Sequence, residues 1–169
     1  LNLEAIPDNA FYQSKITSID IPSSVVSIGV SAFEKCMSLA GNLILPNGLQ
    51  SIGNNAFSNC QKLTGDLNIP NSVINLESNA FSYCKFTALT LGTGITTIPR
   101  RCFLWGQNFT GNLIIPDQIK IIEEEAFSQC TFNGYLTLGS ELQSIGHLAF
   151  SGYSSSSGPV SYTHLTLPT

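Results

Sequence analysis

The sequence contains few charged residues, and few basic ones in particular. Only 11% of its 169 residues are charged, against about 25% in an average soluble domain. Seven Lys and Arg against eleven Asp and Glu give a formal net charge of −4. Because a nucleic-acid partner needs a basic stripe for its phosphates, this balance argues against nucleic acid.

Long hydrophobic runs are also lacking, since no apolar stretch approaches the ~18 residues that a membrane-spanning helix needs. The chain opens at Leu1 with neither an initiator Met nor a signal peptide. We therefore expect a fragment of a longer protein, and the missing signal decides nothing about secretion.

Motifs that carry enzyme or cofactor chemistry are missing as well. The sequence has no G-x-S-x-G, H-E-x-x-H or P-loop motif. It has no C-x-x-C pair, and its two histidines lie far from the cysteines, so a zinc site is not indicated. The acidic run Glu123-Glu124-Glu125 is typical of a solvated edge. We predict no catalytic residue, no metal and no cofactor.

What the chain does have is a repeat. An aliphatic residue precedes a phenylalanine by five positions in every copy, and Ala usually stands directly before the Phe. The phenylalanines fall 22, 24, 24, 22, 24 and 23 residues apart, at Phe11, Phe33, Phe57, Phe81, Phe103, Phe127 and Phe150. A fixed period of this length indicates stacked repeats that bury one continuous core.

A second constant feature, an aliphatic pair around one central residue, precedes the Phe by about 14 positions. We refer to it as the L-x-L segment, and Leu67-Asn68-Ile69 followed by Pro70 is one copy. Period-2 alternation predicts a short strand with its two aliphatic side chains inward and the central residue outward. Pro closes the strand because it has no N–H to donate.

The full pattern, I-P-x-x-V-x-x-I-x-x-x-A-F-x-x-C-x-x-L, resembles the BspA-type leucine-rich repeat of bacterial surface proteins. Residues 21–39 match it position by position, and the match recurs over residues 1–152. The resemblance implies a β-rich, right-handed solenoid of about seven turns with a parallel sheet on its concave face. Residues 1–152 would form this array.

Four of the five cysteines occupy one repeat position, three residues after the Phe. They are Cys36, Cys60, Cys84 and Cys130, whereas Cys102 replaces the Ala before Phe103. Neighbouring turns of a sheet lie about 4.8 Å apart, within disulfide reach on backbone distance alone. The side chains should nevertheless point the same way, which favours a column of buried, reduced thiols.

The outward residues of the L-x-L segments form the candidate binding surface. Solenoids commonly bind partners through such a sheet, although a surface that serves only solubility is equally compatible with the pattern. The candidate partner-binding residues are Asp20, Ile44, Asp66, Asn68, Thr90, Ile114, Tyr135 and Thr137.

Trp105, with Arg100 and Arg101 nearby, is a second candidate because Trp and Arg are enriched at binding hot spots. The alternative is that Trp105 fills the space left by Gly106, which stands in the cysteine position of its repeat.

The repeat pattern stops after residue 152. Residues 153–169 begin with a serine run, Ser154 to Ser157, followed by Gly158 and Pro159, and we interpret them as a flexible or artefactual tail. An alternative is that Leu165-Thr166-Leu167-Pro168 begins an eighth repeat.

The family resemblance implies a non-enzymatic adhesion module of a secreted or cell-surface bacterial protein. Its partners would be host-matrix or bacterial-surface proteins and glycoproteins. Two alternatives remain: the array is a structural spacer, or it accompanies an enzymatic domain outside this fragment.

Overall fold

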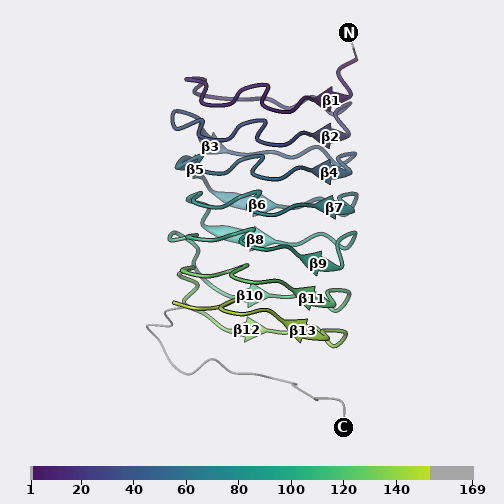
Figure 1. Ribbon diagram of the computed structural model, residues 1–169, viewed down its shortest axis with the longest axis vertical. Helices are drawn as coiled ribbons and strands as arrows, with labels where there is room; N and C mark the ends of the chain where they lie inside the picture. The colour runs from purple at the N-terminus through teal and green to yellow at the C-terminus, as the bar shows by residue number, and fades with distance from the viewer. Residues whose placement is uncertain (1, 153–169) are drawn as a thin grey trace.

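The computed structural model describes residues 2–152, which form a stack of similar turns (Figure 1). The described residues contain only short strands joined by turns and extended segments, with no helix among them. Every strand pair is parallel, with partners one turn apart in the sequence. This confirms the predicted β-solenoid.

One column of strands lies at the aliphatic residue five positions before each Phe. It forms a four-stranded sheet in the order β1-β2-β4-β7 and a three-stranded sheet in the order β13-β11-β9. Figure 1 shows the seven strands one above another along one side of the stack. Their bounds are β1 (Ala5–Ile6), β2 (Ser27–Ile28), β4 (Ser51–Ile52), β7 (Asn75–Leu76), β9 (Thr97–Ile98), β11 (Ile121–Ile122) and β13 (Ser144–Ile145).

The other strands lie at or just before the L-x-L segments and form three separate pairs, with β3–β5 to one side of β6–β8 and β10–β12 (Figure 1). The pair β6–β8 places Asn68 opposite Thr90, and β10–β12 places Ile114 opposite Thr137. The bounds are β3 (Ala40–Asn42), β5 (Lys62–Thr64), β6 (Asp66–Asn68), β8 (Ala88–Thr90), β10 (Leu113–Ile114) and β12 (Leu136–Thr137).

The predicted strand positions are therefore only partly right. The L-x-L copies at residues 19–21 and 43–45 lie outside the strands, although the aliphatic side chains Ile21, Leu43 and Leu45 are buried. The first column was not predicted, because a two-residue strand is too short to display alternation.

The phenylalanines form a continuous ladder through the core. Successive rings from Phe11 to Phe150 are nearly parallel, with interplanar angles of 4° to 11° and centroids 5.0–6.0 Å apart. Six steps join the seven rings, which corresponds to about six complete turns. A shorter stack beside it joins Phe109 to Phe132 at 4.6 Å. Parallel offset rings at these separations attract one another beyond their area burial.

The backbone around each ladder phenylalanine alternates in handedness. The residues two before and two after the Phe have positive φ in every turn, as in Asn55 (55°) and Asn59 (61°) around Phe57. The positive φ at these two positions directs alternate backbone N–H groups toward the following turn. Asn55, Phe57 and Asn59 donate to the carbonyl oxygens of residues 78, 80 and 82 at 2.8–3.0 Å. The turns are thus joined on this side by hydrogen bonds that do not belong to a strand.

The five cysteines are free and buried. The Sγ of Cys36, Cys60, Cys84 and Cys130 each donates to a phenylalanine carbonyl oxygen of the preceding turn, at 2.9–3.2 Å. At the equivalent position in the fifth turn, a Cβ on Gly106 would lie 2.5 Å from the ring of Phe109. Phe109, and not Trp105, therefore occupies the space that this glycine leaves.

Candidate functional site: the outward face of the L-x-L segments

The eight candidate partner-binding residues are all exposed, and we call them together the L-x-L face. The alternation that the sequence predicted produces this arrangement. Asn68 points outward between the buried side chains of Leu67 and Ile69, and Ile114 does so between Leu113 and Ile115. The buried neighbours fix the strand against the core and so determine where each outward side chain lies.

Strand register brings six of the eight residues into neighbouring turns. Asp66 and Asn68 stand opposite Ala88 and Thr90 in the β6–β8 pair. Ile114 stands opposite Thr137, and Tyr135 directly precedes β12. Asp20 and Ile44 lie in extended segments of the earlier turns, outside the strands.

A hollow of about 480 Å³ lies on this face between Ile44 and Asn68. Its rim includes Ile44, Asp66 and Asn68, together with Asn42 and Asn47. Carboxamides and a carboxylate present both donors and acceptors, and Ile44 adds an apolar surface. The arrangement is suited to contacting a polar partner with some apolar character.

Three large side chains give the L-x-L face its apolar character. Ile44 is 77% exposed, Tyr135 66% and Ile114 60%. Tyr135 is held by its backbone, since its N–H donates to Asn112 Oδ1 at 2.9 Å and its carbonyl accepts from Leu113 N–H, also at 2.9 Å. Exposed aromatic and aliphatic side chains on fixed backbone are what a protein interface requires at its centre.

The second candidate cluster is held together by ion pairs. Arg101 Nε and a terminal nitrogen donate to the two carboxylate oxygens of Glu125, at 2.7 and 2.9 Å. Arg100 approaches Glu124 at 3.3 Å. Trp105 is 40% exposed and stacks on Tyr83, with centroids 6.2 Å apart. Both arginines therefore have carboxylate partners within the array.

Within residues 2–152 no group of His, Cys, Asp and Glu side chains is placed to hold a metal ion. The same residues contain no helix that could span a membrane.

A family model described as the BspA-type leucine-rich repeat region, of six copies, matches residues 4–103 and 40–157. The chain belongs to the BspA-type leucine-rich repeat family. The Ala-Phe and Cys positions of the repeat are buried in the inner turns, whereas Ala10 in the first turn and the aliphatic residue Ile145 in the last are exposed.

Solved structures also resemble this repeat array. A leucine-rich cell surface protein from Faecalibacterium prausnitzii A2-165 aligns with a TM-score of 0.67 at 23% identity, covering 90% of this chain and 50% of its own. This BspA-type array thus spans half the length of that protein. A leucine-rich repeat protein from Bacteroides ovatus ATCC 8483 aligns with a TM-score of 0.44 at 19% identity, covering 89% and 57% of the two chains. No curated protein matches the chain.

Sequence reasoning missed some of the surface. Asn47, on the rim of the hollow, lies in the turn after an L-x-L segment, and no pattern in the sequence singles it out. Ile74 (60% exposed) and Ile121 (40%) lie in or beside the strand column that was not predicted. Their exposure could have been derived only by first recognising those two-residue strands.

Proposed function

We propose that this array is a non-enzymatic protein-binding module of a bacterial cell-surface or secreted protein, and that it binds through the L-x-L face. The observation that carries the proposal is the exposure of Ile44, Ile114 and Tyr135 on one face of a regular stack. Large apolar side chains on an otherwise polar surface are typical of interaction sites. Membership of the family and the likeness to a cell-surface protein support a cell-surface or secreted location.

The partner that this face fits is a protein or glycoprotein of the host matrix or of a bacterial surface. Asp20 and Asp66 make the face mildly acidic, while its remaining residues are uncharged. Such a surface suits a partner that offers hydrogen-bond donors around an apolar centre.

A binding experiment with two matched variants tests this proposal. The purified chain is presented to a panel of extracellular-matrix glycoproteins, together with Ile44→Ser/Ile114→Ser/Tyr135→Ser and the control Ile74→Ser/Ile121→Ser. We expect saturable binding that the triple variant loses and the control keeps. A parent protein that melts cooperatively yet binds nothing on the panel would contradict the proposal.

The rival function is a structural spacer, and one observation favours it. The ladder from Phe11 to Phe150 is uninterrupted, which gives a stack of turns with a continuous core. A spacer needs no particular surface, so replacing Asp20, Asn68 and Thr137 by lysine would leave its function unchanged. The same replacements should abolish binding by an adhesion module.

A further inference from the structure

Basic residues are concentrated on one edge of the array. Each turn leaves the core ladder through a five-residue segment that begins two positions after the Phe, and we call these segments the loop edge. In the first four turns they are residues 13–17, 35–39, 59–63 and 83–87, and each contains one lysine: Lys15, Lys35, Lys62 and Lys85. None of the eleven acidic residues lies in any of the four segments. Four of the seven basic residues are therefore gathered there.

Backbone hydrogen bonds hold these segments in register. Gln13 N–H donates to residue 34, and Lys35 N–H donates to Ser58, both at 2.8 Å. Lys62 stands opposite Ala40 in the β3–β5 pair, and Lys85 N–H donates to Leu63 at 3.2 Å. Consecutive turns lie about 4.8 Å apart. Each of the four turns thus places one lysine on the loop edge, and we call these four lysines the basic row, although Lys35 stands opposite Ser58, four residues before Lys62.

A hollow of about 400 Å³ lies at the start of this row. Its lining combines the two ammonium groups of Lys15 and Lys35 with Gln13, Ser14 and Ser38, and with the exposed side chain of Met37. The polar groups offer charge together with hydroxyl and amide hydrogen bonds.

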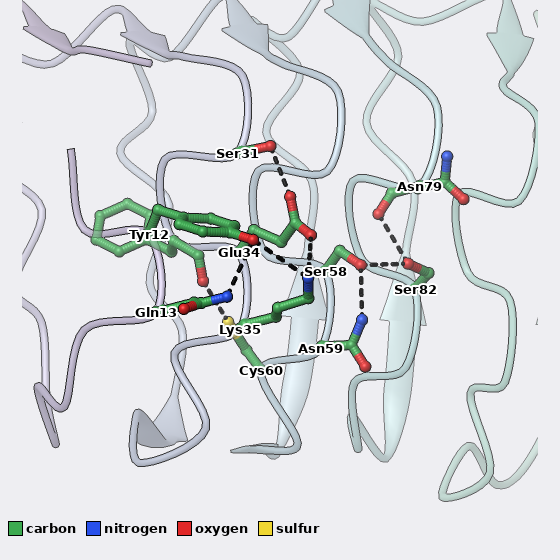
Figure 2. A network of polar contacts seen from close by, with 11 residues as sticks. Tyr12, Gln13, Ser31, Glu34, Lys35, Ser58, Asn59, Cys60, Asn79 and Ser82 are labelled. Carbon is green, nitrogen blue, oxygen red and sulfur yellow. Dashed lines mark hydrogen bonds and ion pairs between the residues drawn. The ribbon is translucent and has the colours of Figure 1, made fainter. Parts of the chain in front are cut away.

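The ammonium group of Lys35 is held in place there. Lys35 Nζ donates to the hydroxyl of Tyr12 at 3.2 Å and lies 5.5 Å from the centroid of that ring (Figure 2). Gln13 donates to the same hydroxyl at 3.0 Å. Glu34 lies 3.5 Å from Lys35, but its other carboxylate oxygen accepts from Ser31 at 2.7 Å. Part of the Lys35 charge is therefore compensated, whereas no salt bridge of the described residues involves Lys15, Lys62 or Lys85.

We propose that the loop edge of turns one to four binds a linear anionic polysaccharide that carries sulfate or carboxylate groups. One ammonium group on each of four successive turns suits a polymer that carries repeated negative charges along its length. Hydroxyl and amide groups beside Lys15 and Lys35 match the sugar hydroxyls between them. The residues that line the hollow include no aromatic side chain on which a nucleic-acid base could stack. A polysaccharide is therefore favoured over a single-stranded nucleic acid.

The loop edge adjoins the L-x-L face, since the hydroxyl of Thr87 donates to Asp66 at 3.4 Å, but the two proposals rest on different residues and are tested with different ligands, so they fail independently. Asp20 and Asp66 place negative charge on the L-x-L face, and Glu123, Glu124 and Glu125 place it in the later turns. The protein as a whole is acidic, which explains why its net charge conceals the basic row.

The test is binding to immobilised heparin and to hyaluronan at about 50 mM salt, with uncharged dextran as a blank. The first variant is Lys15→Ser/Lys62→Ser/Lys85→Ser. The control is Asn68→Asp/Thr90→Asp/Thr137→Asp, which makes the same change in net charge on the L-x-L face. We expect the lysine variant to bind at least about tenfold more weakly, and the control to bind within about twofold of the parent. Binding should weaken steeply as salt rises, because the contacts are exposed charges.

Three results would overturn the proposal. The parent could fail to bind either charged polysaccharide, or the two variants could weaken binding equally, which would mean that only net charge matters. Single-stranded DNA of similar charge could also compete with full effect, which would make the loop edge a general polyanion or nucleic-acid surface. Equal cooperative melts of both variants and the parent establish that folding is not the cause.

Discussion

Cys60 Sγ donates a hydrogen bond to the carbonyl oxygen of Phe33, one turn earlier, at 3.0 Å. The same contact recurs between Cys84 and Phe57 at 3.2 Å. The repeated cysteine is thus more than a small apolar filler, because its thiol donates a second hydrogen bond to a carbonyl oxygen that already accepts a backbone N–H; for Phe33 this is the N–H of Cys36, at 3.1 Å. Serine could make the second bond but would bury a more polar hydroxyl, and alanine would remove the second bond and leave the backbone bond in place.

The first prediction concerns the reactivity of these thiols. Burial raises the pKa of Cys60 and of Cys130 to about 12, and raises those of Cys84 and Cys102 well above the usual value. Since the thiolate is the reactive form, the folded protein should show almost no thiol labelling at pH 8. All five cysteines should react once the chain is unfolded without reductant. A stoichiometric reaction of folded protein within minutes would contradict the buried column.

The second prediction concerns the phenylalanine ladder. Phe81 is 2% exposed and contacts Phe57, Phe103 and Phe86. We expect Phe81→Ala to lower the free energy of unfolding by about 3–5 kcal/mol, since it leaves a cavity in mid-array.

Urea denaturation measures this change, and Tyr83→Ala is the matched control. Tyr83 is an aromatic residue of the same turn but is 39% exposed. Tyr83→Ala should lower the free energy of unfolding much less than Phe81→Ala does. Equal losses in the two variants would mean that the ladder is not the centre of the core.

The third prediction concerns the left-handed backbone beside the ladder. Asn55 has a φ of 55°, a conformation that Asn tolerates and a β-branched residue does not. Asn55→Val should therefore destabilise the protein by about 1–2 kcal/mol, while Asn55→Gly should be nearly neutral. The neighbouring variant Asn54→Val is the control, because Asn54 is not among the residues with positive φ. Thermal melts that rank Asn54→Val as the more damaging change would refute this reading of the backbone.

These positions also show what could and could not be predicted from the sequence. Phe81, Cys60 and the alternating Leu67-Asn68-Ile69 were identifiable because burial imposes one residue type at one spacing. The left-handed positions were not, since Asn55, Arg101 and Trp105 share no side-chain property. There the constraint comes from hydrogen bonds between turns, which fix the backbone and leave the side chain free.

The two candidate surfaces, the L-x-L face and the loop edge, also differ in how far they could be predicted from the sequence. The outward position of Ile44 and Thr90 followed from the burial of their neighbours, so the L-x-L face could be predicted residue by residue. The basic row could not, because Lys35, Lys62 and Lys85 occupy different positions relative to their phenylalanines. Stacking of the turns brings the four loop-edge segments to one edge, without placing Lys35 opposite Lys62.

The fourth prediction concerns acid stability. Hydrogen bonds from Arg101 hold the pKa of Glu125 below its usual value, and those from the backbone and hydroxyl of Ser140 do the same for Asp117. A carboxyl group whose pKa is lowered in the folded state stabilises the fold at pH values above the ordinary carboxyl pKa. This stabilisation is lost as the pH falls through the lowered pKa.

The melting temperature should therefore decrease as the pH is lowered from about 5 to about 3. The decrease should be smaller in Glu125→Gln/Asp117→Asn, measured by circular dichroism at each pH. Glu4→Gln/Glu141→Gln removes two exposed carboxylates for which no ion pair is found among the described residues, and serves as the control. An unchanged pH dependence in the first double variant would show that these contacts contribute nothing to folding.

The most direct test of the L-x-L face as the binding surface is to block it chemically. The native thiols are buried, so Thr90→Cys places one reactive thiol on this face, and Ile74→Cys places one beside the other strand column. Each protein is labelled with a bulky maleimide polymer and its affinity for the glycoprotein bound by the parent is measured. We predict that the label at residue 90 abolishes binding and that the label at residue 74 leaves it within about twofold of the parent. Undiminished binding with the label at residue 90 would contradict the central claim.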